Sequence, residues 1–146
     1  MEETYISTSI EDTQEIASKL VAKLEQGANI CLWGDLAAGK TTFTQGIGKY
    51  FNIPRVISPT YIIVREYPVT NHPVIKMLYH LDLYRLENQS DLKSFDLGEI
   101  ISDSSNLNII EWPEKMGEDL PKKRIDVYLK ATDDNEREIK IVKHQK

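Results

Sequence analysis

The sequence predicts an α/β fold, in which one domain over residues 1–146 has a mixed parallel and antiparallel sheet flanked by helices. A length of 146 residues suits a single core. The first half of the chain alternates short apolar runs with segments of helical spacing, which is typical of a parallel α/β core. The second half contains alternating segments joined by turn sequences, which predict added antiparallel strands.

The first half contains two predicted pairs of a strand and a helix. Each strand is a short apolar run, and each helix carries apolar residues at the spacing of one helical face. Ser9 and Asp12 are placed like a capping box at the start of the first helix, and Gly27 is expected to end that helix. We expect strands over residues 5–7 and 30–33 and the second helix over residues 40–51.

Beyond Pro54 the sequence predicts mostly strands, with one short helix over residues 89–95. Turn-forming residues over 68–73 and 132–135 predict two hairpin connections, each between neighbouring strands of the chain. The expected strands cover residues 60–67, 74–83, 107–110, 124–130 and 138–142.

Composition and charge limit the class of protein. A net charge of −5 argues against a protein that holds nucleic acid by an overall positive field. The single cysteine, Cys31, lies in an apolar run, so we expect a buried thiol and no internal disulfide. The N-terminus lacks the apolar segment of a secretory signal, and no apolar stretch approaches the ~20 residues that span a bilayer. We therefore expect a cytoplasmic protein without a membrane segment.

The strongest motif follows the second predicted strand. Gly34, Gly39, Lys40 and Thr41 match the Walker A pattern G-x-x-x-x-G-K-[ST]. In such a loop, backbone N–H groups and the N-terminus of the next helix bind phosphates, the lysine reaches the β and γ phosphates, and the hydroxyl ligates Mg²⁺. The sequence therefore predicts a nucleotide site. Ala37 occupies a loop position where glycine would fit, so we expect either a negative φ or a strained backbone there.

Two acidic residues end apolar runs that predict strands. Asp82 follows the run over 77–81, and Glu111 follows the run over 107–110. Ligands of open α/β sheets bind at the carboxyl ends of the strands, so either residue is a candidate to hold Mg²⁺ or its waters. Asp82 is also a candidate to orient the attacking water.

Two further segments are candidates for the same chemistry. In the string His-x-Asp-x-Tyr-Arg at 80–85, the first three named residues would share one face of an extended strand, and Arg85 could neutralise charge on a transferred phosphoryl group. Residues 58–61, Ser-Pro-Thr-Tyr, are candidates for a switch that senses the γ-phosphate. The histidines and Cys31 show no spacing typical of zinc ligands.

Taken together, these strings resemble the bacterial TsaE family, also called YjeE, of the tRNA threonylcarbamoyladenosine pathway. The order and spacing of the strings fit this family over nearly the whole chain. The resemblance implies a P-loop NTPase-like domain that is a weak ATPase using ATP and Mg²⁺. The matching strings are Gly-Asp-Leu-Ala-Ala-Gly-Lys-Thr-Thr at 34–42, Ser-Pro-Thr-Tyr at 58–61, His-Leu-Asp-Leu-Tyr-Arg at 80–85 and Glu-Trp-Pro-Glu at 111–114.

The resemblance also implies partners. Members of this family work with TsaB and TsaD, which transfer a threonylcarbamoyl group to the adenosine next to the anticodon of tRNAs that read ANN codons. Because the chain is acidic and its one basic run, residues 122–124, is short, we expect tRNA to be met only through these partners.

The resemblance assigns roles to individual residues. Thr41 and Glu111 carry over as Mg²⁺ ligands, and Trp112 carries over as a tryptophan beside the site. The usual family loop has glycine where this chain has Ala37. Adenine contacts are expected around residues 9–13 and near Asn135. The nucleotide-binding candidates are Gly34, Leu36, Ala37, Ala38, Gly39, Lys40, Thr41, Thr42 and Asn135, and the catalytic candidates are Lys40, Thr60, Asp82 and Arg85.

Three alternatives share the Walker A loop. A small-molecule or nucleoside kinase usually adds an arginine-rich lid, whereas the arginines of this chain are few and scattered. A GTPase would carry Asp-x-x-Gly and Asn-Lys-x-Asp, and neither string occurs. A non-enzymatic module, in which ATP is an assembly ligand and hydrolysis only resets it, stays open on sequence alone.

Overall fold

The computed structural model describes residues 1–54, 64–86 and 97–145. Within these residues, seven strands form one sheet in the order β1-β7-β6-β2-β5-β4-β3, and helices pack on the sheet. The strands are β1 (Glu2–Ser7), β2 (Ala28–Trp33), β3 (Val64–Pro68), β4 (Met77–Asp82), β5 (Asn106–Glu111), β6 (Arg124–Ala131) and β7 (Arg137–His144). The helices are α1 (Ile10–Ala22), α2 (Lys40–Tyr50), α3 (Leu97–Ser102) and the 3-10 helix η2 (Pro113–Asp119).

The centre of the sheet is parallel and its two edges are antiparallel. Strand β2 pairs in parallel with both β5 and β6, and β4 pairs in parallel with β5. The pairs β1–β7, β6–β7 and β3–β4 are antiparallel. The mixed sheet that the sequence predicts is thus confirmed. Because β2, β4 and β5 run the same way, their carboxyl ends meet at one edge of the sheet.

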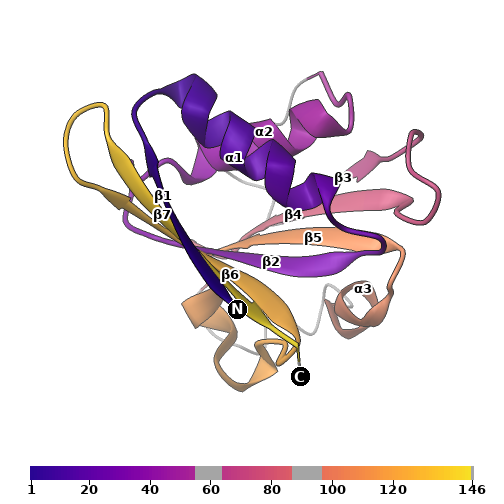
Figure 1. The fold of residues 1–146 in the computed structure, drawn as a ribbon. Coiled ribbons are helices and arrows are strands. Elements are labelled where there is room, and N and C mark those ends of the chain that lie inside the picture. The colour runs from indigo at the N-terminus through magenta and orange to yellow at the C-terminus, as the bar shows by residue number, and fades with distance from the viewer. Residues whose placement is uncertain (55–63, 87–96, 146) are drawn as a thin grey trace.

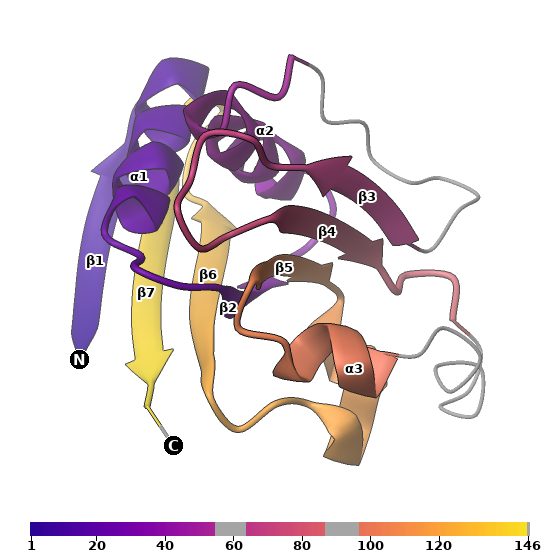
Figure 2. The ribbon, with the colours of Figure 1, turned by 90° about the vertical axis from the view of Figure 1, so that its right-hand side faces the viewer.

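Helices cover both faces of the sheet (Figures 1 and 2): α1 and α2 lie side by side on one face, and α3 lies on the other. Successive side chains of a strand point to opposite faces, so β2 contributes to two cores. Ile30 and Leu32 pack with Phe43 and Ile47 of α2, whereas Cys31 packs with Met116 of η2. The Cys31 thiol is fully buried, as expected, and this burial raises its pKa to about 12.

Local signals set the first helix, although its end differs from the prediction. The Ser9 side chain caps α1 by accepting a hydrogen bond from the backbone N–H of Asp12 at 3.0 Å. The helix ends at Ala22 and not at Gly27. Gly27 instead belongs to the connection into β2, where its N–H donates to the Ser104 carbonyl at 2.6 Å.

Several other expectations change in the second half of the chain. Strand β4 covers Met77–Asp82 and is shorter than the predicted 74–83, so Tyr84 lies in a turn and not on the strand. The helices α3 and η2 were not predicted. The expected helix over 89–95 and the first residues of the expected strand over 60–67 lie outside the described residues. None of the helices in the described part of the chain is long and apolar enough to cross a membrane.

Candidate functional site

The Walker A loop joins the carboxyl end of β2 to the N-terminus of α2. Gly39 is the N-cap of α2 and has a φ of +104°, a region that favours glycine. A Cβ at Gly34 would lie 2.6 Å from the Leu129 carbonyl oxygen, so only glycine fits against β6 there. Ala37 has a φ of +67°, so of the two expected alternatives the strained backbone is the one observed.

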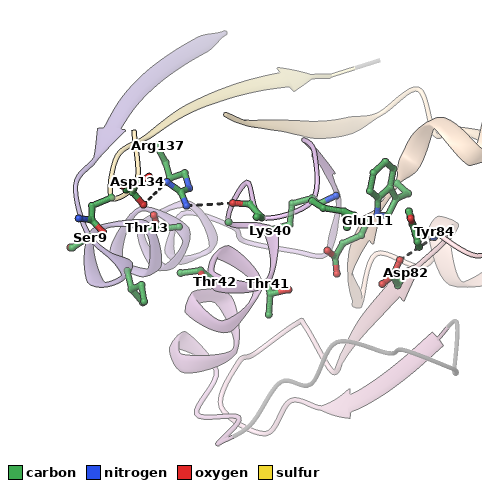
Figure 3. A pocket seen from close by; sticks show the side chains of 16 residues that line it. Ser9, Thr13, Lys40, Thr41, Thr42, Asp82, Tyr84, Glu111, Asp134 and Arg137 are labelled. Atoms are coloured by element: carbon green, nitrogen blue, oxygen red, sulfur yellow. Dashed lines mark hydrogen bonds between the residues drawn. The ribbon is translucent and has the colours of Figure 1, made fainter. Parts of the chain in front are cut away.

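A cavity of about 450 Å³ lies over this loop. Figure 3 shows Ser9, Thr13, Asp134 and Arg137 at one end and Glu111, Asp82 and Tyr84 at the other, with Lys40, Thr41 and Thr42 between them. The lining residues are Ser9, Ile10, Thr13, Leu36, Ala37, Gly39, Lys40, Thr41, Thr42, Asp82, Tyr84, Glu111, Trp112, Asp134, Asn135 and Arg137. The cavity therefore has two carboxylates, Asp82 and Glu111, at one end, and Arg137 with Asp134 at the other.

Lys40 is held at the base of the cavity. Lys40 is only 6% exposed, and its Nζ donates a hydrogen bond to the Gly34 carbonyl at 2.8 Å. Nζ also lies 3.8 Å from the centroid of the Trp112 ring, a distance at which the ring face attracts a cation. Burial lowers the pKa of Lys40, and nearby carboxylates, Glu111 first among them, oppose that shift. The loop thus carries a buried cation between a carbonyl and an aromatic face.

Asp82 and Glu111 lie opposite each other at the ends of neighbouring strands. The two residues are register partners of β4 and β5. Glu111 is 4% exposed, and its Oε2 lies 2.5 Å from Nε2 of His80. The Asp82 carboxylate accepts a hydrogen bond from the backbone N–H of Tyr84 at 3.0 Å, and burial raises the pKa of Asp82. Two carboxylates so close favour a cation between or beside them.

The donor atoms at this end of the cavity fit Mg²⁺. Carboxylate and hydroxyl oxygens are the ligands that this ion prefers, and it is usually held by one or two protein carboxylates together with phosphate oxygens and waters. Thr41, Asp82 and Glu111 provide such oxygens on the same side of the loop (Figure 3). Within the described residues no group of three or more His, Cys, Asp or Glu side chains is arranged to hold a metal ion.

The opposite end of the cavity contains Arg137, which sequence reasoning missed. Its Nη1 donates to the backbone carbonyls of Asp133 and Glu136, each at 3.0 Å. Its Nη2 donates to the carbonyl of Ala37 at 3.4 Å, which joins the β6–β7 hairpin to the Walker A loop. Nothing near Arg137 in sequence marks this contact, because the two residues are 100 positions apart.

The structure brings most of the candidate residues together, with four exceptions. Gly34 and Ala38 belong to the loop but do not line the cavity, and Ala38 is buried beneath it. Arg85 is exposed and lies outside the lining, so its role stays a prediction. Thr60 lies outside the described residues. The lining includes the other candidates, namely Leu36, Ala37, Gly39, Lys40, Thr41, Thr42, Asp82, Glu111 and Asn135.

Two aromatic residues close the acidic end. Trp112 follows β5 directly, with a φ of +60° that turns the chain into η2. The Tyr84 ring lies against it with centroids 5.0 Å apart. The expectation that His80, Asp82 and Tyr84 share one strand face is therefore wrong for Tyr84, because β4 ends at Asp82 and the next residues form a turn. Trp112 lies beside the site, where the resemblance placed it.

Comparisons with known proteins agree on one family. The family model described as "Threonylcarbamoyl adenosine biosynthesis protein TsaE" matches residues 7–139. A tRNA threonylcarbamoyladenosine biosynthesis protein TsaE of Bacillus subtilis (strain 168) is 39% identical over 131 residues, which cover 88% of this chain and 78% of that protein. The TsaE protein of Treponema pallidum (strain Nichols) is 34% identical over 139 residues, which cover 93% of this chain and 97% of that protein.

A solved structure agrees with the sequence comparisons. The crystal structure of Bacillus subtilis YdiB matches this structure with a TM-score of 0.79 and 30% sequence identity. The match covers 99% of this chain and 86% of that chain. The architecture is thus a P-loop NTPase-like fold along nearly its full length.

Proposed function

The chain belongs to the TsaE family of tRNA threonylcarbamoyladenosine biosynthesis proteins, and on that premise we propose that it binds and hydrolyses ATP with Mg²⁺ in support of this pathway. One observation carries the proposal: the Walker A loop opens into a cavity in which Lys40, Thr41, Asp82 and Glu111 converge. A cation, a hydroxyl and two carboxylates beside a helix N-terminus are the groups that phosphoryl transfer from a nucleotide requires.

Each group has a role in this proposal. The loop N–H groups and the N-terminus of α2 bind phosphate oxygens, and the Lys40 ammonium offsets their charge. Thr41 and Glu111 hold Mg²⁺, which neutralises charge on the phosphates when it is bound. Asp82 orients the attacking water, because its carboxylate lies at the end of β4 next to Glu111. Asn135 and the segment over residues 9–13 contact the adenine.

We further propose that the protein acts together with TsaB and TsaD in the cytoplasm. Its ATPase cycle supports transfer of a threonylcarbamoyl group to the adenosine next to the anticodon of tRNAs that read ANN codons. The charge distribution supports contact with tRNA through the partners only. The net charge is −5, and in the basic run 122–124 the guanidinium of Arg124 is bound to the buried carboxylate of Asp126 at 3.0 Å. Lys122 and Lys123, the two exposed lysines of this run, supply too few phosphate contacts for strong binding of tRNA.

Calorimetry with ATP and ADP tests the nucleotide site. Lys40→Ala should weaken ATP binding strongly and abolish hydrolysis, because the buried cation at the base of the cavity is removed. Lys49→Ala is the matched control, since Lys49 lies in the last turn of the same helix and contacts Gln14. Unchanged ATP affinity in Lys40→Ala would refute the assignment of this cavity as the nucleotide site.

Reconstitution tests the role in the pathway. tRNA modification by TsaB and TsaD should require this protein and ATP, and its ATPase turnover should rise when both partners are present. Full modification without this protein would refute the partnership. Full modification with a non-hydrolysable ATP analogue would instead favour the alternative in which ATP acts as an assembly ligand.

A further inference from the structure

His80 holds the carboxylate of Glu111 from the neighbouring strand. In the β4–β5 register His80 pairs with Ile109, two residues before Glu111. Residues two apart on a strand share a face, so His80 and Glu111 are diagonal neighbours on the face that bears α2. The imidazole is fully buried, and its Nε2 lies 2.5 Å from Oε2 of Glu111. Among the described residues, no other hydrogen bond reaches this carboxylate.

The hydrogen bonds of the His80 ring indicate its role. A carboxylate only accepts hydrogen bonds, so Nε2 is the nitrogen that bears the hydrogen, and it donates a hydrogen bond to Glu111. The other ring nitrogen, Nδ1, is buried and has no partner among the described residues. A buried polar atom without a partner is unfavourable, and an apolar side chain at this position would avoid that cost. Among the described residues, Glu111 is therefore the one polar partner of this ring.

We propose that His80 is a positioning residue that orients the Glu111 carboxylate toward the Mg²⁺ of a bound nucleotide. The inference rests on the proposed function, since it deepens the role of Glu111 there. By holding Oε2, His80 keeps the carboxylate turned into the cavity, on the side where Thr41 and Asp82 lie (Figure 3). The nearby carboxylate of Asp82 repels the carboxylate of Glu111. The hydrogen bond from His80 keeps the Glu111 carboxylate from rotating away from Asp82.

Two amide substitutions separate positioning from packing. In His80→Gln the side-chain NH₂ reaches about as far as Nε2, whereas in His80→Asn it reaches only about as far as Nδ1. The readout is the ratio of ADP affinities measured by calorimetry with Mg²⁺ and with EDTA. His80→Asn should reduce this ratio by about 10–100-fold, the usual effect of removing a group that orients a metal ligand, and should leave the affinity in EDTA unchanged. His80→Gln should retain most of the ratio.

Glu111→Gln provides the reference and the double-mutant cycle. Alone it should abolish the gain from Mg²⁺, and His80→Asn added to it should cause no further loss, because His80 acts through Glu111. If His80→Asn does not fold, His80→Leu takes its place, because leucine fills the buried position and donates no hydrogen bond: a reduced ratio there with a retained ratio in His80→Gln supports positioning, and a retained ratio in His80→Leu refutes it.

The outcomes also separate this inference from the proposed function. If Glu111→Gln loses the gain from Mg²⁺ and His80→Asn keeps it, the positioning role of His80 is refuted and the metal site stands. If His80→Asn lowers the affinity in EDTA and the melting temperature together, with no change in the ratio, the ring is structural and the inference is likewise refuted. If the wild-type protein binds ADP with no gain from Mg²⁺, the proposed metal site and the inference fall together.

Discussion

Replacing Ala37 with glycine should stabilise the protein. Ala37 has a φ of +67°, and the left-handed region costs an L-residue about 1–2 kcal/mol through contact between Cβ and the carbonyl oxygen. Glycine removes this cost but adds about 0.4–1 kcal/mol of backbone entropy to the unfolded chain. The Ala37 side chain is exposed, so its loss removes no buried contact. We expect a net gain of about 0.5–1 kcal/mol in the free energy of unfolding, which corresponds to a rise of about 1–4 °C in Tm for a chain of this size.

The neighbouring alanine provides a matched control. Ala38 is buried and is not among the residues with positive φ, so the same substitution there removes an apolar group from the core and adds unfolded-state entropy without relieving strain. Ala38→Gly should therefore lower the free energy of unfolding by about 1–2 kcal/mol. Urea denaturation and scanning calorimetry of the nucleotide-free protein measure both changes. If Ala37→Gly destabilises the protein as much as Ala38→Gly does, the left-handed conformation of Ala37 and the reasoning built on it are wrong.

Three further expectations follow from the described contacts. Burial raises the pKa of the Cys31 thiol to about 12, so at pH 8 the native protein should resist alkylation and react only on unfolding, as mass spectrometry after pulse labelling would show. Ser9→Ala removes the cap of α1 and should cost about 1 kcal/mol of stability in urea denaturation; no measurable change would show that the cap is dispensable. Asp82→Ala should leave ATP affinity intact and abolish turnover, whereas Glu111→Ala should shift the Mg²⁺ requirement; a Mg²⁺–nucleotide complex with Asp82 as direct ligand and Glu111 remote would reverse these roles.

Contiguous patterns predicted most of the fold. The cap at Ser9, the apolar run of β2 and the Walker A loop each lie within a few neighbouring residues, so their physics can be worked out without tertiary contacts. The missed elements lack such signals. Helix α3 has six residues, too few for a helical period to be visible, and η2 begins where Trp112 takes a φ of +60°. The end of α1 at Ala22 was not foreseen, because the expected stop residue, Gly27, belongs instead to the connection into β2, where it is bound to the carbonyl of the distant Ser104.

In the candidate site, too, some contacts could be predicted from neighbouring residues and others depend on the tertiary structure. The pairing of Asp82 with Glu111 was foreseeable in kind, because both residues end apolar strands and the carboxyl ends of parallel strands share one edge. The contact of His80 with Glu111 was not, because it depends on which residue of β4 lies beside Ile109. A shift of one residue in that register would turn the imidazole to the other face of the sheet. Strand register is decided by the packing of both faces and has no marker in the string His-x-Asp-x-Tyr-Arg.

Ala37 has a conformation that the loop sequence leaves open and a contact with a residue far away in the chain. The sequence allowed either a negative φ or strain at this position, and the structure shows a φ of +67°. Arg137 reaches the Ala37 carbonyl from the start of β7, while its other terminal nitrogen is fixed by carbonyls of the β6–β7 turn. The antiparallel pairing of β6 with β7 places that turn beside the loop, so that Arg137 contacts the carbonyl of the left-handed residue. The Walker A motif indicates the chemistry of the loop, and the hairpin of β6 and β7 adds a contact to the loop that the motif does not contain.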